Sequence, residues 1–266
     1  MTKSVFLDSE GRVKPPPKRL LLREFRGLLK PRPPLSRVLS LVNAPRGDGH
    51  PVFVLPGLLT TDSRTRRLRK FLTQLGYAVY GWEQGVNIGP TDRALAGIER
   101  RFLDIKRRHG RKVTLIGHSL GGVFARDLAK RYPDDVRHLV LLGSPIHLPT
   151  ASNLGTIFQL LSRFHRTTGN WTLDELNRPP PDTVPVSALH TRSDGIVAWE
   201  TCLEVEGPQR ENIEVQGTHS RLPSNPQALA IIAARLAQPE GEWQVHQAEP
   251  IIHAGFRQRT KPRFFT

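Results

Sequence analysis

Three residues that together could perform acyl transfer occur in the order serine, aspartate, histidine. Ser119 lies in GHSLG, Asp194 in HTRSDGIV and His219 in VQGTHS. A serine hydroxyl becomes a nucleophile when a neighbouring imidazole takes its proton, and a buried carboxylate fixes the tautomer of that imidazole. We therefore interpret Ser119 as the candidate nucleophile, His219 as the base and Asp194 as the acid.

The surroundings of Ser119 predict a tight turn between a strand and a helix. A Cβ at Gly117 or Gly121 would crowd such a turn, and the turn would hold Ser119 in a strained conformation. The backbone N–H of Leu120 then becomes one donor for an oxyanion. We expect the second donor in Pro56-Gly57-Leu58-Leu59, at the N–H of Leu58 or, as the alternative, of Leu59.

Each of the three residues also has a purely structural reading. Ser119 could be a turn serine, Asp194 a turn residue before a glycine, and His219 a loop histidine. Against this, the loop 143–145 after the preceding strand reads Gly-Ser-Pro and offers no carboxylate, which favours Asp194 as the acid. We expect packing and hydrogen bonding from His118 and a structural role for His190.

These residues must be positioned by alternating strands and helices. Short apolar runs predict strands, and amphipathic stretches with capping residues and a following glycine or proline predict helices. The strands are expected at 51–57, 77–82, 113–117, 136–143, 184–190 and 211–215, and the helices at 61–75, 91–109, 120–131 and 226–238.

This alternation predicts an α/β protein with an open, mostly parallel sheet of about six strands and helices on both faces. Sites in such sheets form at the carboxyl ends of strands, where Ser119, Asp194 and His219 would each lie on a loop.

The chain between about 50 and 240 resembles the α/β-hydrolase fold, and within it compact bacterial lipases and esterases. The resemblance rests on GHSLGG as nucleophile elbow, PGLL as oxyanion loop, SDGIV as acid loop and GTHS as histidine loop. The segment GWEQGVNIGP (81–90) is similar to bacterial α/β hydrolases whose substrates are not assigned. The resemblance implies hydrolysis of carboxylic esters. The two antiparallel strands with which that fold begins are not visible in residues 1–49, so a reduced sheet is expected.

We predict three regions: a basic, proline-rich extension at 1–49, the hydrolase domain at 50–240, and a basic tail at 241–266. Of the net charge of +15, residues 1–50 carry +7 (11 basic, 4 acidic) and residues 253–266 carry +4 (4 basic, none acidic). Leu20, Leu21, Leu22, Phe25, Leu28 and Leu29 would form one face of a short helix that ends before Pro31. Such a helix packs against its own domain or lies on a membrane.

An insertion at 144–183 is expected to form a small apolar cap over the site. Its side chains Phe158, Leu161, Phe164 and Trp171 would contact an acyl chain or another apolar ester group, or would only pack the cap onto the body.

The sequence thus predicts a serine esterase or lipase acting on a small-molecule or lipid ester. An acyltransferase with the same three residues and a non-catalytic adaptor remain as alternatives. No metal-ligand spacing or phosphate-binding glycine loop occurs, so no cofactor is expected. We expect no nucleic-acid partner, a cytoplasmic location, and as an open alternative peripheral contact of the basic ends with an anionic membrane. The single Cys202 excludes an intrachain disulfide, and the N-terminus shows no secretory signal.

Overall fold

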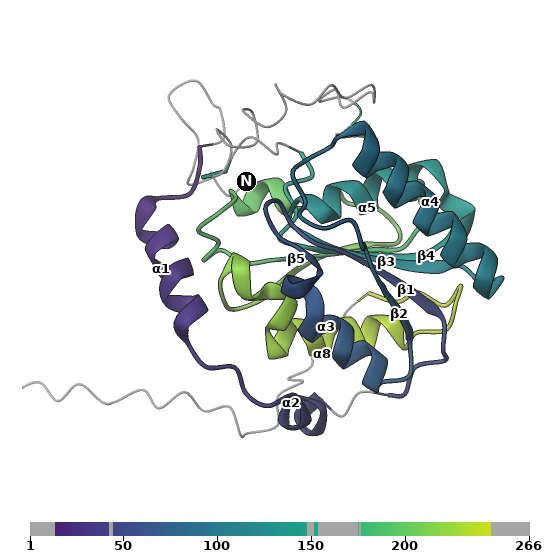
Figure 1. The fold of residues 1–266 in the computed structure, drawn as a ribbon, viewed down its shortest axis with the longest axis horizontal. Coiled ribbons are helices and arrows are strands. Elements are labelled where there is room, and N and C mark those ends of the chain that lie inside the picture. The colour runs from purple at the N-terminus through teal and green to yellow at the C-terminus, as the bar shows by residue number, and fades with distance from the viewer. Residues whose placement is uncertain (1–13, 43–44, 148–151, 154–174, 176, 246–266) are drawn as a thin grey trace, which may run out of the picture.

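A computed structural model of the protein describes residues 14–42, 45–147, 152–153, 175 and 177–245. Six parallel strands form one sheet in the order β2-β1-β3-β4-β5-β6 (Figure 1). The strands are β1 (Pro51–Leu55), β2 (Ala78–Gly81), β3 (Val113–His118), β4 (Val136–Leu142), β5 (Val186–His190) and β6 (Arg210–Glu214).

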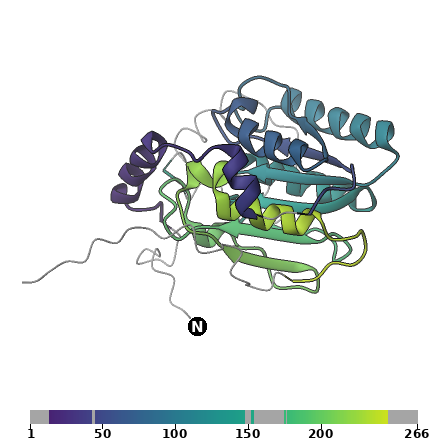
Figure 2. The ribbon, with the colours of Figure 1, turned by 90° about the horizontal axis from the view of Figure 1, so that it is seen from below.

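Helices cover both faces of this sheet (Figures 1 and 2). Helices α4 (Asp92–His109) and α5 (Leu120–Arg131) pack on one face, and α3 (Asp62–Gln74) and α8 (Pro226–Leu236) pack on the other. Helix α1 (Lys18–Leu29) contacts the short 3₁₀ helix η3 (His219–Ser224), and α2 (Leu35–Val42) contacts α3 and α8. Two further 3₁₀ helices are η1 (Pro133–Asp135) and η2 (Trp199–Cys202). The predicted open parallel sheet is confirmed. The described part of the N-terminal extension contains α1 and α2 and no strand.

Alternation along the strands divides the core into two layers. Phe53 and Leu55 of β1 pack with α4 and α5, whereas Val52 and Val54 point to the opposite face and pack with α3 and α8. Every β1 residue is buried, as expected for a strand covered on both sides. Because all six strands are parallel, the carboxyl ends of β1, β3, β5 and β6 lie at one edge of the sheet.

The helix boundaries follow from capping side chains. The Thr61 hydroxyl accepts a hydrogen bond from the N–H of Ser63 at the start of α3, and the Thr91 hydroxyl accepts one from Ala94 at the start of α4. Gly110 ends α4 in the left-handed conformation, with φ 60°. The predicted regions 1–49, 50–240 and 241–266 are compatible with β1 beginning at Pro51 and α8 ending at Leu236, and their boundaries stay predictions.

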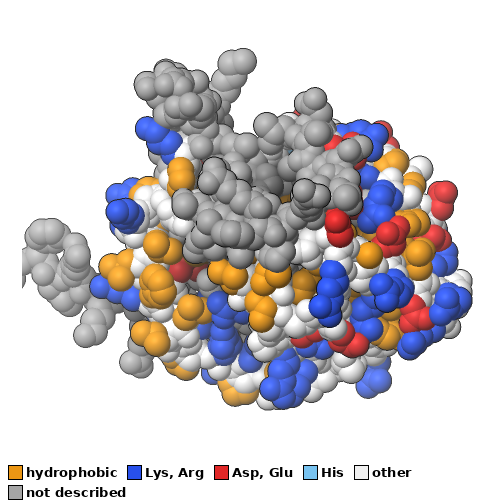
Figure 3. Space-filling view, turned by 45° about the horizontal axis from the view of Figure 1, so that its top comes forward, with side chains coloured by type: hydrophobic (Ala, Val, Ile, Leu, Met, Phe, Trp, Pro, Cys, Tyr) orange, Lys and Arg blue, Asp and Glu red, His pale blue; other side chains and the backbone are white. Residues whose placement is uncertain are grey.

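Helix α1 forms as predicted, but it turns an unexpected face to the domain. Leu22, Phe25 and Leu29 are exposed, by 52%, 60% and 86%, while Glu24 and Gly27 are buried against η3. In Figure 3, hydrophobic side chains gather among Lys and Arg on the side of the molecule where Figure 1 places α1. In the described part of the chain no helix is long and apolar enough to cross a membrane.

Buried histidines at the amino ends of the strands make the fold sensitive to acid. His138 on β4 bonds through Nε2 to the Ser187 hydroxyl (2.9 Å), which in turn donates to Glu211. Burial, together with the nearby charges of Arg235, His50 and Arg137, lowers the pKa of His138 to about 3. This imidazole is therefore neutral in the folded protein at pH 5.

We predict that lowering the pH from 7 to 5 reduces the free energy of unfolding, and that His138→Gln reduces this loss by about 2 kcal/mol. A histidine whose pKa falls on folding binds more protons when unfolded, so its contribution is lost as the pH drops below about 6.5. Urea unfolding of both proteins at both pH values measures the effect. Equal losses in wild type and variant would contradict the assignment.

Candidate active site

Ser119 occupies the strained turn that the glycines predict. It links β3 to α5 with φ 53° and ψ −126°, a conformation that costs a non-glycine residue about 1–3 kcal/mol. A Cβ on Gly117 would lie 2.1 Å from Gly122 Cα, and a Cβ on Gly121 would lie 2.4 Å from the carbonyl oxygen of Leu55. Both glycines are therefore required sterically, and that prediction is confirmed.

The Ser119 side chain is poised rather than bonded. The backbone N–H of Ser119 donates to the carbonyl of Leu142 (2.9 Å), and the residue is 9% exposed. Within the described residues its hydroxyl makes no hydrogen bond. Leu120 begins α5, so N–H groups of the first helical turn lie beside the hydroxyl.

Asp194 and His219 form a buried pair. His219 Nδ1 lies 2.6 Å from Asp194 Oδ2, and the residues are 4% and 2% exposed. The other carboxylate oxygen of Asp194 accepts hydrogen bonds from the N–H groups of Ile196 and Val197, both at 2.8 Å. The carboxylate is thus fixed by its own loop and directs Nδ1 of the imidazole, which leaves Nε2 as the nitrogen that can accept a proton.

The surroundings favour the protonated form of His219. Burial alone would lower the pKa of His219, but the charge of Asp194 and the hydrogen bond to it outweigh burial, and Glu24 adds to their effect. Arg64 acts in the opposite direction. The net result is a pKa above the usual 6.5. An imidazolium formed by proton transfer would therefore be stabilised.

The histidine loop lies directly against the serine turn. The rings of His118 and His219 have their centroids 4.9 Å apart, and His118 Nε2 lies 3.1 Å from the carbonyl oxygen of His219, to which it can donate. A Cβ on Gly143, which follows the partner of the Ser119 N–H, would lie 3.1 Å from His219 Nδ1. Among the described residues no bond joins Ser119 to His219, and such bonds often tighten only when substrate binds.

His118 and His190 take the structural positions expected of them. Burial first, and then the charge of His219, hold the pKa of His118 well below its usual value, so this ring is neutral. His190 stacks on Trp199 at 5.4 Å between centroids. No group of three or more His, Cys, Asp or Glu side chains within the described ranges is arranged to hold a metal ion.

The oxyanion loop distinguishes its two candidate donors. The N–H of Leu59 is occupied, because it donates to the carbonyl of Asn87 (2.7 Å). The N–H of Leu58 has no partner within the described part of the chain. A Cβ on the adjacent Gly57 would lie 3.0 Å from Ser119 Cβ, so the loop passes next to the serine. The geometry therefore favours Leu58 over Leu59 as the partner of Leu120.

Asn87 holds this loop, a role that the sequence did not reveal. Its side-chain N–H₂ donates to the carbonyl of Pro56 (2.8 Å), its backbone N–H donates to Thr60 (2.9 Å), and its carbonyl accepts from Leu59. Asn87 is fully buried. In the sequence, the segment GWEQGVNIGP stood out only by resemblance, and the burial and hydrogen bonds of Asn87 are visible only in the structure.

Glu24 of α1 is a second residue that sequence reasoning missed. Its Oε1 accepts hydrogen bonds from the N–H groups of His219 (2.7 Å) and Gly195 (3.1 Å), and its Oε2 accepts one from Ser220 (2.9 Å). The residue is 2% exposed. One carboxylate thus joins the acid loop to the histidine loop. The available signal was an isolated acid, since Glu24 is the only one between Glu10 and Asp48.

Most of the predicted cap at 144–183 lies outside the described residues. Phe158, Leu161, Phe164 and Trp171 lie outside the described residues, and their contact with substrate stays a prediction. Ile146, at the start of the same insertion, is buried in the core on the α4 and α5 face.

We predict that Glu24→Gln moves the acid limb of Ser119 labelling by a fluorophosphonate to lower pH and slows the plateau rate. The base must be neutral to act, and removing the Glu24 charge lowers the pKa of His219 toward its ordinary value. The rate of labelling between pH 5 and 9 measures both changes. The matched control is Glu206→Gln at an exposed acid. An unchanged limb would contradict a positioning role for Glu24.

We also predict that Asn87→Ala slows fluorophosphonate labelling of Ser119 at least about tenfold. Loss of one oxyanion donor lowers kcat about 10²–10³-fold, and this substitution displaces the loop that bears the candidate donor Leu58. Asn212→Ala is the control, since its amide likewise bonds two backbone groups, the N–H and carbonyl of Glu204, both at 2.8 Å. Equal slowing in both variants would assign the effect to stability.

Comparison with solved structures finds several enzymes whose fold is similar to that of this chain. The chain is similar to a structure reported with the metagenome-derived lipolytic enzymes LipS and LipT (13% identity, 72% of this chain and 93% of that one, TM-score 0.51). It is also similar to a pyrethroid hydrolase from Sphingobium faniae (19%, 71% and 98%, 0.52) and to lipase B of Aspergillus fumigatus (17%, 74% and 54%, 0.55). At these identities the likeness concerns the fold alone.

A family model supplies a relationship in sequence. None of the curated proteins compared with the chain matches it. Residues 49–188, more than half of the chain, match the family described as serine aminopeptidase, S33. The matched range includes Leu58, Asn87 and Ser119 and ends before Asp194. With the parallel sheet and the serine turn, this match shows that the chain belongs to the S33 family of α/β hydrolases.

Proposed function

We propose that this α/β hydrolase cleaves carboxylic esters through Ser119, His219 and Asp194. The proposal rests on the buried hydrogen bond between His219 Nδ1 and Asp194 Oδ2 (2.6 Å), together with the strained turn that holds Ser119 at φ 53°. A carboxylate-oriented imidazole beside a serine in such a turn has the parts needed for acyl transfer. The lipolytic enzymes among the structural neighbours are consistent with an ester substrate.

The reaction proceeds in two steps. Ser119 Oγ attacks the ester carbonyl while His219 Nε2 takes the hydroxyl proton, and the N–H groups of Leu58 and Leu120 stabilise the oxyanion. His219 then gives that proton to the leaving alcohol, which leaves an acyl group on Ser119. Water, deprotonated by His219, attacks the acyl-enzyme, and His219 returns the proton to Ser119 Oγ as the acid is released.

Charge near the site favours an ester over the amino-terminal peptide that the family description names. An aminopeptidase must hold a protonated amine, for which a carboxylate is the natural partner. The two buried carboxylates by the site, Asp194 and Glu24, are already engaged by His219 and by backbone N–H groups. Arg64 adds positive charge near His219. Neither of these two carboxylates is therefore free to hold the amine of an amino-terminal peptide.

We predict that the enzyme hydrolyses members of a p-nitrophenyl ester series from acetyl to palmitoyl, and that Ser119→Ala reduces turnover at least about 10⁴-fold. Ser40→Ala on α2 is the control. Aminoacyl p-nitroanilides test the peptidase alternative in the same assay. Retained ester turnover in purified Ser119→Ala would overturn the nucleophile assignment. Acyl transfer to an added alcohol in place of hydrolysis would favour an acyltransferase.

A further inference from the structure

A cationic hollow lies beside the oxyanion loop. Its volume is about 670 Å³, and its walls include Leu59 and Thr60, which directly follow the candidate donor Leu58. Five of the residues that line it are basic, and none of the described ones is acidic. The basic residues are Arg32, Arg64, Arg66, Arg67 and Lys70.

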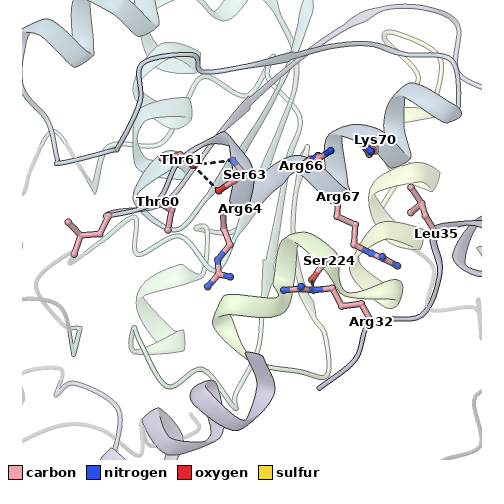
Figure 4. A pocket seen from close by; sticks show the side chains of 11 residues that line it. Arg32, Leu35, Thr60, Thr61, Ser63, Arg64, Arg66, Arg67, Lys70 and Ser224 are labelled. Atoms are coloured by element: carbon pink, nitrogen blue, oxygen red, sulfur yellow. Dashed lines mark hydrogen bonds between the residues drawn. The ribbon is translucent and has the colours of Figure 1, made fainter. Parts of the chain in front are cut away.

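Two segments bring these cations together (Figure 4). Helix α3 supplies all but Arg32, which comes from the link between α1 and α2. In Figure 4 the side chains of Arg64 and Arg67 extend from α3 on the side where Arg32 lies. Arg32 Nε donates to the Ser224 hydroxyl on η3 (3.3 Å).

The guanidinium groups repel one another. Burial lowers the pKa of both Arg64 and Arg67, and the charge of Arg32 lowers each further. Burial and then the charges of Arg32 and Arg67 likewise lower the pKa of the neighbouring Arg221. Folding thus brings cations together at an energetic cost that a bound anion would offset.

Much of the hydrogen-bonding capacity of this group is unused. In the described part of the chain, the Arg64 side chain makes no hydrogen bond, and Arg67 Nε is buried without a partner, although Arg67 Nη2 donates to the carbonyl of Pro33. None of the five cations pairs with a described carboxylate. Glu24, whose charge reaches Arg64, is already held by three backbone N–H groups.

A second surface hollow shows how this protein neutralises arginines elsewhere. That hollow, of about 750 Å³, is lined by Arg93, Arg100, Arg101 and Arg107, but also by Glu83 and Asp104. Arg101 pairs with Glu83, and Arg107 pairs with Asp104 at 2.6 Å. The hollow beside the oxyanion loop has no such described acids, so its charge is available to a ligand.

We propose that the hollow lined by Arg32, Arg64 and Arg67 binds a phosphate group. A carboxylate is satisfied by a single guanidinium, whereas a phosphate offers three or more oxygens and up to two charges to several. The phosphate belongs either to a soluble molecule or to a lipid headgroup. The site is independent of the proposed reaction, and its test needs no turnover.

The test is isothermal titration of the purified protein with inorganic phosphate at pH 8, with chloride matching the ionic strength. Arg32→Gln is the variant, because glutamine can keep the contact with Ser224. We expect it to lose phosphate affinity about tenfold or more. Its Tm without phosphate should equal or exceed that of wild type, since one repelling charge is gone. Arg93→Gln in the second hollow removes the same charge and should leave phosphate binding unchanged.

A second arm identifies the source of the phosphate. Vesicles of phosphatidylcholine with and without phosphatidic acid are sedimented with the three proteins. Phosphate binding that depends on Arg32 supports a soluble ligand. Binding to phosphatidic acid alone, lost in Arg32→Gln and kept in Arg93→Gln, supports a lipid headgroup. Binding of neither probe, or equal losses in both variants, overturns the proposal.

Discussion

Where β3 turns into α5, the backbone of the serine turn lies in close contact with the backbone that follows β1. This contact constrains the geometry of the rest of the site. Leu55 of β1 lies beside Gly117 of β3 in the sheet, so the chain leaving β1 must pass over the serine turn. It can do so only because Gly121 presents no Cβ to the carbonyls of Leu55 and Pro56. The strand register thus brings the loop that contains Leu58 next to the serine, and the Asn87 side chain holds the loop there.

The sequence was sufficient for whatever depends on local pattern. Apolar runs, caps such as Thr61 and Thr91, and the glycines around Ser119 each act within a few residues, and together they predicted six parallel strands and the strained serine. The meeting of Asp194 with His219 also followed, because the carboxyl ends of neighbouring parallel strands share one edge. The predicted bond between them is present at 2.6 Å.

Interactions between a side chain and a distant backbone left no such pattern. Glu24 bonds to N–H groups 171 to 196 positions away, and any residue except proline offers an N–H. Asn87 likewise recognises carbonyls rather than residue types. The burial of Glu24 on α1 was missed for the same reason: the apolar stripe of this helix is visible in the sequence, whereas the three N–H groups that bind Glu24 are not. The convergence of Arg32 with α3 also required the tertiary structure.

Glu24 supports the candidate site from outside the region that the family match covers. The family match begins at residue 49, and the sheet, the serine turn and Asn87 all lie beyond that point. Yet the acid and histidine loops are joined by a carboxylate from the extension before it. Grafting residues 49–240 into another protein would therefore transfer the architecture but leave three buried N–H groups without an acceptor. Relatives that begin at the scaffold must support their histidine loop by other means, so loop substitutions tolerated in them are a poor guide to those tolerated here.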